Sequence, residues 1–214
     1  MSKKILNGFI DLQVNGYLGV DFSSKELSEE KFIWASLKLL NNGTLAFLPT
    51  IITSNKSLYK KNLRIISKCM EYKELKNRIL GIHLEGPFIS DKEGAVGAHN
   101  KKYTRKPSIK FLKKLIKYSN NNIKLITLAP ELENSKELIE YANKYNITVS
   151  AGHHLATSEQ ITTFSNNKGK AWTHFGNGIP NSLPRHENGI LSGLLDNKLS
   201  LMLIGDGHHL PKSF

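Results

Sequence analysis

The sequence has a single cysteine and no long apolar run, and each scarcity excludes a class of protein. Cys69 cannot form an intramolecular disulfide, which favours a reducing, cytoplasmic setting. No apolar stretch approaches the roughly 20 residues that span a bilayer. The start, MSKKILNGFIDLQ, also lacks the apolar core of a signal peptide. We therefore expect a cytoplasmic protein with no membrane partner.

Arginine is scarce as well, although the net charge is +12. The lysines are spread along the segments 56–76 and 101–117 and are not gathered in one basic arm. We therefore expect no nucleic-acid partner. A basic field still attracts small anionic ligands, so the charge is compatible with a phosphorylated substrate.

Short apolar runs alternate with segments of helical periodicity, which is typical of βα units around a parallel sheet. The expected strands span 8–14, 44–50, 79–84, 122–129, 147–152, 170–174 and 199–205. The expected helices span 28–41, 56–74, 108–119, 135–145, 158–166 and 190–196. The residues that stand where N-caps belong are Ser28, Ser135 and Thr157, the last followed by Ser158 in the same role.

Seven strands with intervening helices predict an α/β fold, a TIM-type (β/α)8 barrel with one strand missing. We expect the residues 1–214 to form one incomplete barrel domain, because such barrels typically need about 250 residues. The missing strand would leave the first and seventh strands with unpaired edges. The chain stops one short loop after the seventh strand, which we interpret as a truncation.

Three expected strands end in a side chain that can bind a metal. Glu85 lies in HLEGPF, His153 in SAGHH and His174 in THFGNG. Each alone has a structural interpretation, because a strand-end Glu can cap a helix and a strand-end His often packs. Together they match a catalytic zinc with an open fourth position. His154 points to the opposite side if the strand continues, so we expect it to pack or hydrogen-bond.

Other polar residues limit or extend this site. Gln13 stands where a two-metal hydrolase would carry a histidine, and a neutral amide is a poor zinc ligand. We therefore expect one divalent metal ion. His99, Arg185 and the segment GDGHH (205–209) supply donors around the same rim. His99 and Arg185 can equally be surface loop residues.

These segments resemble the N-acetylglucosamine-6-phosphate deacetylases of the amidohydrolase superfamily. The matching segments are GFIDLQVNG (8–16), GIHLEGPF (81–88), GAH (97–99), TLAPE (127–131), SAGHH (150–154), THFGNG (173–178) and GDGHH (205–209), in family order. HLEGPF together with TLAPE is far more specific than a lone histidine motif. The resemblance implies a metal-dependent enzyme of amino-sugar catabolism, which converts N-acetylglucosamine 6-phosphate to glucosamine 6-phosphate and acetate.

The resemblance also implies roles for single residues. Glu85, His153 and His174 would hold the metal, usually zinc, and Gln13 matches the single-metal variety of the family. The residues that would line the sugar-phosphate site are Ala98, His99, Asn177, Gly178, Asp206, Gly207, His208 and His209. Arg185 matches a position that reaches the phosphate of the neighbouring subunit's substrate, which implies a homodimer.

The chain departs from the family pattern in several ways. Gly176 replaces a bulkier aromatic residue, and Gly178 and Ile179 replace the usual Ala-Met. The small β-sandwich of the family is missing at both ends. The general acid/base, an aspartate at the end of the eighth strand, is expected beyond the C-terminus, so we assign no catalytic residue. The alternatives are a catalytically weak or inactive sugar-phosphate-binding homologue and another amidohydrolase.

Overall fold

A computed structural model describes residues 8–211 and 213. The expected absence of a signal peptide and the expected truncation fall partly on residues 1–7, 212 and 214, outside the described residues. The chain divides into two compact units. Unit 1 comprises Met1–Ile51, Asn55–His83 and Lys114–Lys124, and unit 2 comprises Ile52–Ser54, Leu84–Lys113 and Leu125–Phe214. The single domain expected for 1–214 stays a prediction.

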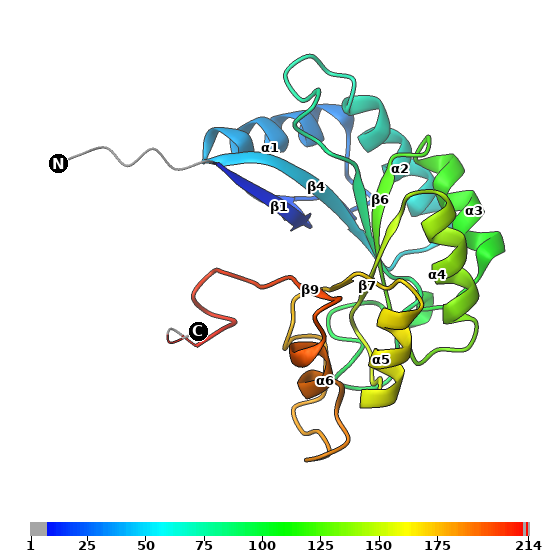
Figure 1. The fold of residues 1–214 in the computed structure, drawn as a ribbon. Helices are drawn as coiled ribbons and strands as arrows, with labels where there is room; N and C mark the ends of the chain where they lie inside the picture. Colours follow the sequence, from blue (N-terminus) through cyan, green and yellow to red (C-terminus); the bar gives the residue numbers. More distant parts are fainter. Residues whose placement is uncertain (1–7, 212, 214) are drawn as a thin grey trace. The chain divides into compact units, whose positions relative to one another are not determined.

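Unit 1 contains the first strands and helices (Figure 1). Strand β1 (Phe9–Val14) pairs in parallel with β4 (Thr44–Ile52). Helices α1 (Glu29–Asn41) and α2 (Lys56–Cys69) contact each other. A short antiparallel hairpin of β2 (Gly16–Tyr17) and β3 (Val20–Asp21), which the sequence did not suggest, follows β1.

Three strands and one helix begin in one unit and end in the other. They are β4, whose last residue Ile52 belongs to unit 2, β5 (Ile82–Glu85), β6 (Ile123–Leu128) and α3 (Ile109–Tyr118). In unit 2, β6 pairs in parallel with β7 (Thr148–Ala151), β7 with β8 (Ala171–Trp172) and β8 with β9 (Ser200–Leu201). The remaining helices of unit 2 are η1 (Lys101–Tyr103), α4 (Ser135–Lys144), α5 (Ser158–Asn166) and α6 (Gly189–Leu195).

The strand order of the sheet is β1-β4-β5-β6-β7-β8-β9, which is also the order along the chain. A helix follows each strand from β4 to β8 before the next strand begins. This succession of βα units confirms the predicted TIM-type fold with seven strands. Because parallel strands end at the same edge, residues just after their carboxyl ends can meet.

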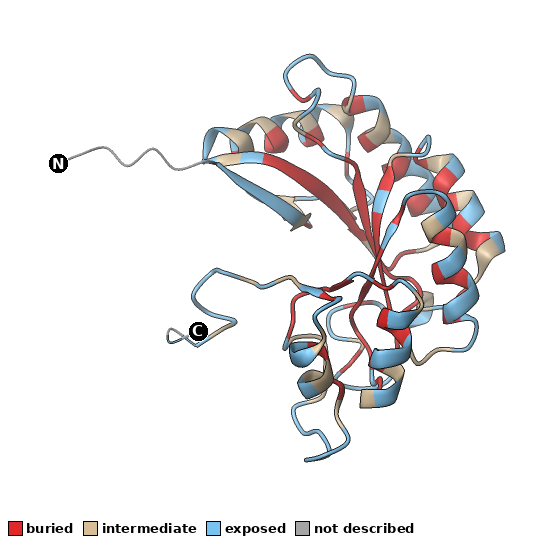
Figure 2. Cartoon of the chain, in the orientation of Figure 1, coloured by how far each residue is buried: buried red, intermediate tan, exposed pale blue. Residues whose placement is uncertain are grey.

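The burial pattern explains why these segments form a sheet with helices around it. Figure 2 shows β4 buried along most of its length, and its residues 46–51 are all buried. Helix α2 instead alternates, with Tyr59, Leu63 and Ile66 buried at helical spacing and the lysines on the other face. A run buried on both faces is typical of a parallel strand, and a one-sided stripe is typical of a covering helix.

The predicted strands and helices are all present, with shifted ends. Helix α2 stops at Cys69, well before the expected residue 74, because a series of turns follows. Strands β8 and β9 each have only two residues, since the expected runs 170–174 and 199–205 continue as loops. No helix within the described part of the chain is long and apolar enough to cross a membrane.

Two of the predicted N-caps are correct and two are wrong. The Ser28 hydroxyl accepts a hydrogen bond from the Lys31 N–H, and Thr157 forms a capping box at the start of α5. Ser158 is instead the first residue inside that helix. At α4 the cap is Asn134, in the left-handed region at φ 66°, without a side-chain cap. Ser135 fails as a cap because its hydroxyl donates backwards to two carbonyls, of Ala129 and Leu132.

Candidate metal centre

Three candidate ligands come together in unit 2. Glu85 is the last residue of β5, and His153 and His174 each lie two residues after the ends of β7 and β8. The Glu85 Oε1 atom lies 2.9 Å from His174 Nε2 and 3.3 Å from His153 Nε2. The two Nε2 atoms are 3.0 Å apart. The structure therefore brings the predicted ligands to one point, while metal binding itself stays a prediction.

A fourth side chain, His99, joins this cluster from the loop after β5. Its Nε2 atom lies 3.1 Å from His153 Nε2 and 3.6 Å from Glu85 Oε2. Among the described residues, Glu85, His99 and His153 form a group that could hold a metal ion, with ligand atoms within 4.8 Å of one another. All four residues are buried. Distances thus allow either His99 or His174 as the third ligand.

The hydrogen bonds made by Nδ1 give His153 and His99 different tautomers. The Nδ1 atom of His153 lies 2.8 Å from the Ala95 carbonyl oxygen, so Nδ1 donates and Nε2 keeps its lone pair for a metal. The Nδ1 atom of His99 instead accepts the Thr53 N–H at 3.3 Å. We therefore assign the neutral tautomer with Nε2–H to His99. A ring that presents N–H to the cluster is a hydrogen-bond donor and not a ligand.

The crowding around His153 Nε2 fits a bound cation. This atom has three polar neighbours between 3.0 and 3.3 Å, on His99, His174 and Glu85. An imidazole nitrogen has one position in the ring plane, either a proton or a lone pair. One proton cannot satisfy three such neighbours, whereas lone pairs of two nitrogens and a carboxylate can converge on one divalent ion. The donor set therefore fits a divalent metal.

The electrostatics of Glu85 keep it available as an anion. Burial alone would raise the pKa of its carboxyl, but the adjacent imidazoles of His153 and His174 hold the pKa well below its usual range. A buried, ionised carboxylate needs positive partners or a metal. Glu85 therefore supplies the negative charge of the site.

Backbone conformation and two glycines place the histidine rings. His153 and His174 have φ angles of 52° and 35°, in the left-handed region that non-glycine residues rarely adopt. Gly97 lies against the His153 ring, where a Cβ atom would be 3.1 Å from Cε1. At Gly178 a Cβ atom would lie 2.9 Å from His174 Cε1 and 3.0 Å from His153 Nδ1. The missing side chain at residue 178 therefore lets this loop approach both rings.

A chain of buried hydroxyls joins the strand ends beneath the cluster. Thr173 Oγ1 lies 2.7 Å from Thr127 Oγ1 and 2.7 Å from Ser150 Oγ. These residues come from β6, from β7 and from the position directly after β8. Gly152 fits between them, because a Cβ atom there would lie 2.5 Å from Thr127 Cγ2. The hydroxyls hold the strand ends that carry the histidines.

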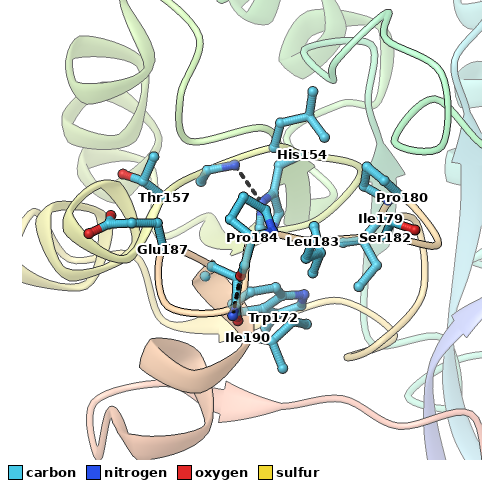
Figure 3. A pocket seen from close by; sticks show the side chains of 14 residues that line it. His154, Thr157, Trp172, Ile179, Pro180, Ser182, Leu183, Pro184, Glu187 and Ile190 are labelled. Carbon is cyan, nitrogen blue, oxygen red and sulfur yellow. Dashed lines mark hydrogen bonds between the residues drawn. The ribbon is translucent and has the colours of Figure 1, made fainter.

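The second histidine of SAGHH, His154, packs away from the cluster as expected, although β7 already ends at Ala151 and strand alternation is not the reason. Its Nδ1 accepts the Ala156 N–H at 3.1 Å, and its ring lies 4.5 Å from the Trp172 ring. Both rings border a cavity of about 280 Å³, shown in Figure 3, whose other wall is the segment from Ile179 to Ile190, which includes the start of α6. Burial and the neighbouring His153 and His174 lower the pKa of His154 to about 3, so the ring is neutral.

The roles of the other predicted residues remain untested. Gln13 is in β1 of unit 1. Ala98 and Arg185 are exposed, and the Asn177 N–H donates to the His174 carbonyl. Asp206 accepts from the His208 and His209 N–H groups, which lower its pKa to about 2, and its carboxylate lies 2.7 Å from His209 Nδ1. Their roles in substrate binding stay predictions.

Thr53 and Ala95 contact the cluster histidines and were not predicted from the sequence. Thr53 directly follows β4, so its place after an apolar run was a usable signal. Ala95 acts through its carbonyl group, and a backbone role leaves no signal in residue type.

The fold and this site together define a class: a TIM-type α/β chain with a buried Glu/His cluster whose side chains could hold a divalent metal. No family model matches the chain. The chain is 35% identical to the N-acetylglucosamine-6-phosphate deacetylase of Caenorhabditis elegans over 127 residues, which cover 57% of this chain and 30% of the relative.

Solved structures agree. The N-acetylglucosamine-6-phosphate deacetylase of Pasteurella multocida superposes with a TM-score of 0.82 and 31% identity over 95% of this chain and 52% of the other. The Mycobacterium smegmatis enzyme, solved in complex with N-acetyl-D-glucosamine-6-phosphate, matches with a TM-score of 0.84 and 21% identity, over 95% of this chain and 51% of that one. The resemblance to the N-acetylglucosamine-6-phosphate deacetylases is confirmed, and the chain spans about half the length of these structures.

Proposed function

We propose that the chain carries the metal site of an enzyme that deacetylates N-acetylglucosamine 6-phosphate to glucosamine 6-phosphate and acetate. The observation that supports this most is the buried cluster in which His153 presents a lone pair and His99 presents an N–H group. The relatives named as deacetylases and the net charge of +12, which suits an anionic sugar, point the same way.

Glu85, His153 and His174 would hold one metal ion, and we propose zinc, because two nitrogens and one carboxylate are a common catalytic zinc set. Gln13, a neutral amide, supports one metal and not two. When bound, zinc supplies Lewis-acid chemistry: it polarises a carbonyl group and lowers the pKa of a water molecule toward about 7.

His99 would stabilise the transition state. Its Nε2–H group points into the cluster, where it can donate to the acetamide oxygen as negative charge develops there. The departing amine must also take up a proton. The resemblance assigns this step to an aspartate after an eighth strand, and without it cleavage would slow by roughly 10²–10⁴-fold.

The remaining assignments follow from the resemblance and are proposals. Ala98, Asn177, Gly178 and the turn 206–209 would bind the sugar phosphate. Arg185, exposed on its loop, would reach the phosphate of a neighbouring subunit's substrate in a homodimer. We also propose a cytoplasmic location, which the single, free Cys69 supports.

The proposal is tested by acetate release from N-acetylglucosamine 6-phosphate and from unphosphorylated N-acetylglucosamine, with the zinc-loaded chain. We expect faster release from the phosphorylated sugar and none from a Glu85→Gln variant. Equal release from both sugars would favour another amidohydrolase. Saturable binding of the phosphorylated sugar without acetate release would favour the inactive, sugar-phosphate-binding homologue.

A further inference from the structure

The His99 ring has a second contact behind it that sets which nitrogen faces the cluster. Thr53 offers two groups to the same atom, His99 Nδ1: its backbone N–H at 3.3 Å and its hydroxyl oxygen at 2.9 Å. Thr53 and His99 are both buried and both belong to unit 2. The contact with the hydroxyl is shorter than the contact with the backbone N–H, so the Thr53 side chain restrains the His99 ring more strongly.

The direction of the hydroxyl hydrogen bond follows from the backbone contact. The Thr53 N–H can only donate, so Nδ1 must accept and carries no proton. A hydroxyl beside an unprotonated nitrogen donates as well. The proton of the neutral ring is then on Nε2, which faces two acceptors, His153 Nε2 at 3.1 Å and Glu85 Oε2 at 3.6 Å. The contacts of Nδ1 and those of Nε2 both favour the tautomer with the proton on Nε2.

The absence of a side chain at Gly86 leaves room for the Thr53 hydroxyl. Gly86, directly after Glu85, has φ 83°, and a Cβ atom there would lie 2.3 Å from Thr53 Oγ1. Any larger residue at 86 would occupy the position of the hydroxyl. The glycine that follows the metal-ligand candidate therefore also accommodates Thr53.

We infer that Thr53 is a positioning residue: its hydroxyl fixes His99 in the Nε2–H tautomer and holds that N–H group toward the reacting carbonyl. This inference rests on the proposed function for its effect on rate, although the tautomer itself does not. Thr53 touches no reacting atom and acts only through His99.

The test compares Thr53→Val, which removes the hydroxyl at nearly constant volume, with Thr53→Ser, which keeps it. Ser54→Ala is the matched control, because Ser54 is an adjacent buried hydroxyl that donates to the Ile52 carbonyl instead. Ring ¹⁵N NMR of the full chain reports which nitrogen of His99 is protonated, and loss of a signal in His99→Asn assigns it. Circular dichroism confirms that each variant is folded.

We expect Nδ1 of His99 to be unprotonated in the wild type, in Thr53→Ser and in Ser54→Ala. We expect it to be partly protonated in Thr53→Val, where only the longer backbone contact of 3.3 Å remains to oppose a proton on Nδ1. If the proposed function holds, kcat of Thr53→Val falls about tenfold with KM and zinc content unchanged. This loss is smaller than the roughly 100- to 1000-fold cost of removing an oxyanion donor outright. Thr53→Ser should restore the rate.

An unchanged His99 tautomer in folded Thr53→Val would overturn the inference. A wild-type chain that releases no acetate would count against the proposed function alone, because the NMR result still decides the role of Thr53. If Thr53→Val does not fold, a wild-type or Thr53→Ser spectrum with a protonated Nδ1 contradicts the inference, and an unprotonated Nδ1 in both supports it.

Discussion

At the scale of single residues, the histidines of the cluster differ in what lies behind each ring. A carbonyl group behind His153 leaves Nε2 free to bind a metal, and an N–H group behind His99 leaves Nε2 as a donor. Residue type is the same in both, so the difference in chemistry comes from the backbone partner. The Nδ1 atom of His174 has no hydrogen-bond partner among the described residues.

Replacement of the single carboxylate of the cluster should remove most of the metal affinity. We expect Glu85→Gln to weaken zinc binding by more than about 100-fold. This exceeds the 10–100-fold effect that is typical when a residue hydrogen-bonded to a metal ligand is replaced. Isothermal titration with zinc measures this. Glu133→Gln, which changes an exposed carboxylate paired with Lys106, should bind zinc like the wild type. Equal affinity of both variants would contradict the ligand assignment.

We expect glycine at 178 to be required because it leaves room for the histidine rings, and not only because its φ angle is positive. Gly176 and Gly178 both have positive φ, 86° and 63°, so alanine at either should cost about 1 kcal/mol of stability. Only at 178 would the new Cβ meet the His153 and His174 rings, since nothing lies within 4 Å of a Cβ at 176. We therefore expect Gly178→Ala alone to weaken zinc binding. Zinc titration and urea unfolding of the two variants separate the effects.

At the scale of elements, strand ends and helix caps determine where the site residues lie. The hydroxyl chain from Thr127 to Ser150 connects β6 and β7 to the residue after β8. The helix that follows β7 starts at a capping box, in which Thr157 accepts from the Gln160 N–H and Gln160 accepts from the Thr157 N–H. This cap ends the loop that carries His153 and His154.

The capping box gives a prediction about this element. Thr157→Ala should lower the free energy of unfolding by about 1 kcal/mol, because the Gln160 N–H in the first turn loses its side-chain partner. Thr162→Ala in the same helix, at an exposed position, should change it by less than about 0.5 kcal/mol. Urea denaturation measures both. Similar effects at the two positions would contradict the cap.

At the scale of the whole molecule, Cys69 reports folding. Burial, followed by the charge of Glu29, raises the pKa of its thiol from 9.0 to about 11. The folded chain therefore holds the thiol protonated, and this contribution to stability is full below pH 9.0 and is lost as the pH rises toward about 11. The thiolate is the reactive form, so the buried thiol should react slowly at neutral pH.

The prediction is that iodoacetamide modifies Cys69 slowly in native buffer at pH 8 and rapidly in denaturant. Mass spectrometry at timed intervals follows the reaction of this single cysteine. Raising the pH from 9 to 11 should both accelerate modification and lower the urea midpoint. Equal rates in native and denaturing buffer would contradict the buried position of Cys69.

Much of the fold could be predicted because the periodicities are strong. Apolar runs such as 44–50 and one-sided helices such as 56–69 carry their structure in the residue pattern. The ends could not be predicted, since Ser135 has the chemistry of an N-cap but donates to carbonyls behind it. Glu85, His153 and His174 could be found by their places after strands. The place of Thr53 directly after β4 was a usable signal, although its contact with His99 was not visible in the sequence. The role of Ala95 depends on its backbone carbonyl and could not be predicted.

Our main proposal for this site is that His153, the first histidine of SAGHH, binds the metal and that His154 does not. The most direct measurement is the zinc content of His153→Ala and His154→Ala after dialysis against limiting zinc, by inductively coupled plasma mass spectrometry. We expect about one zinc per chain in folded His154→Ala, as in the wild type, and almost none in His153→Ala. Zinc retained by His153→Ala, or lost only from His154→Ala, would contradict it.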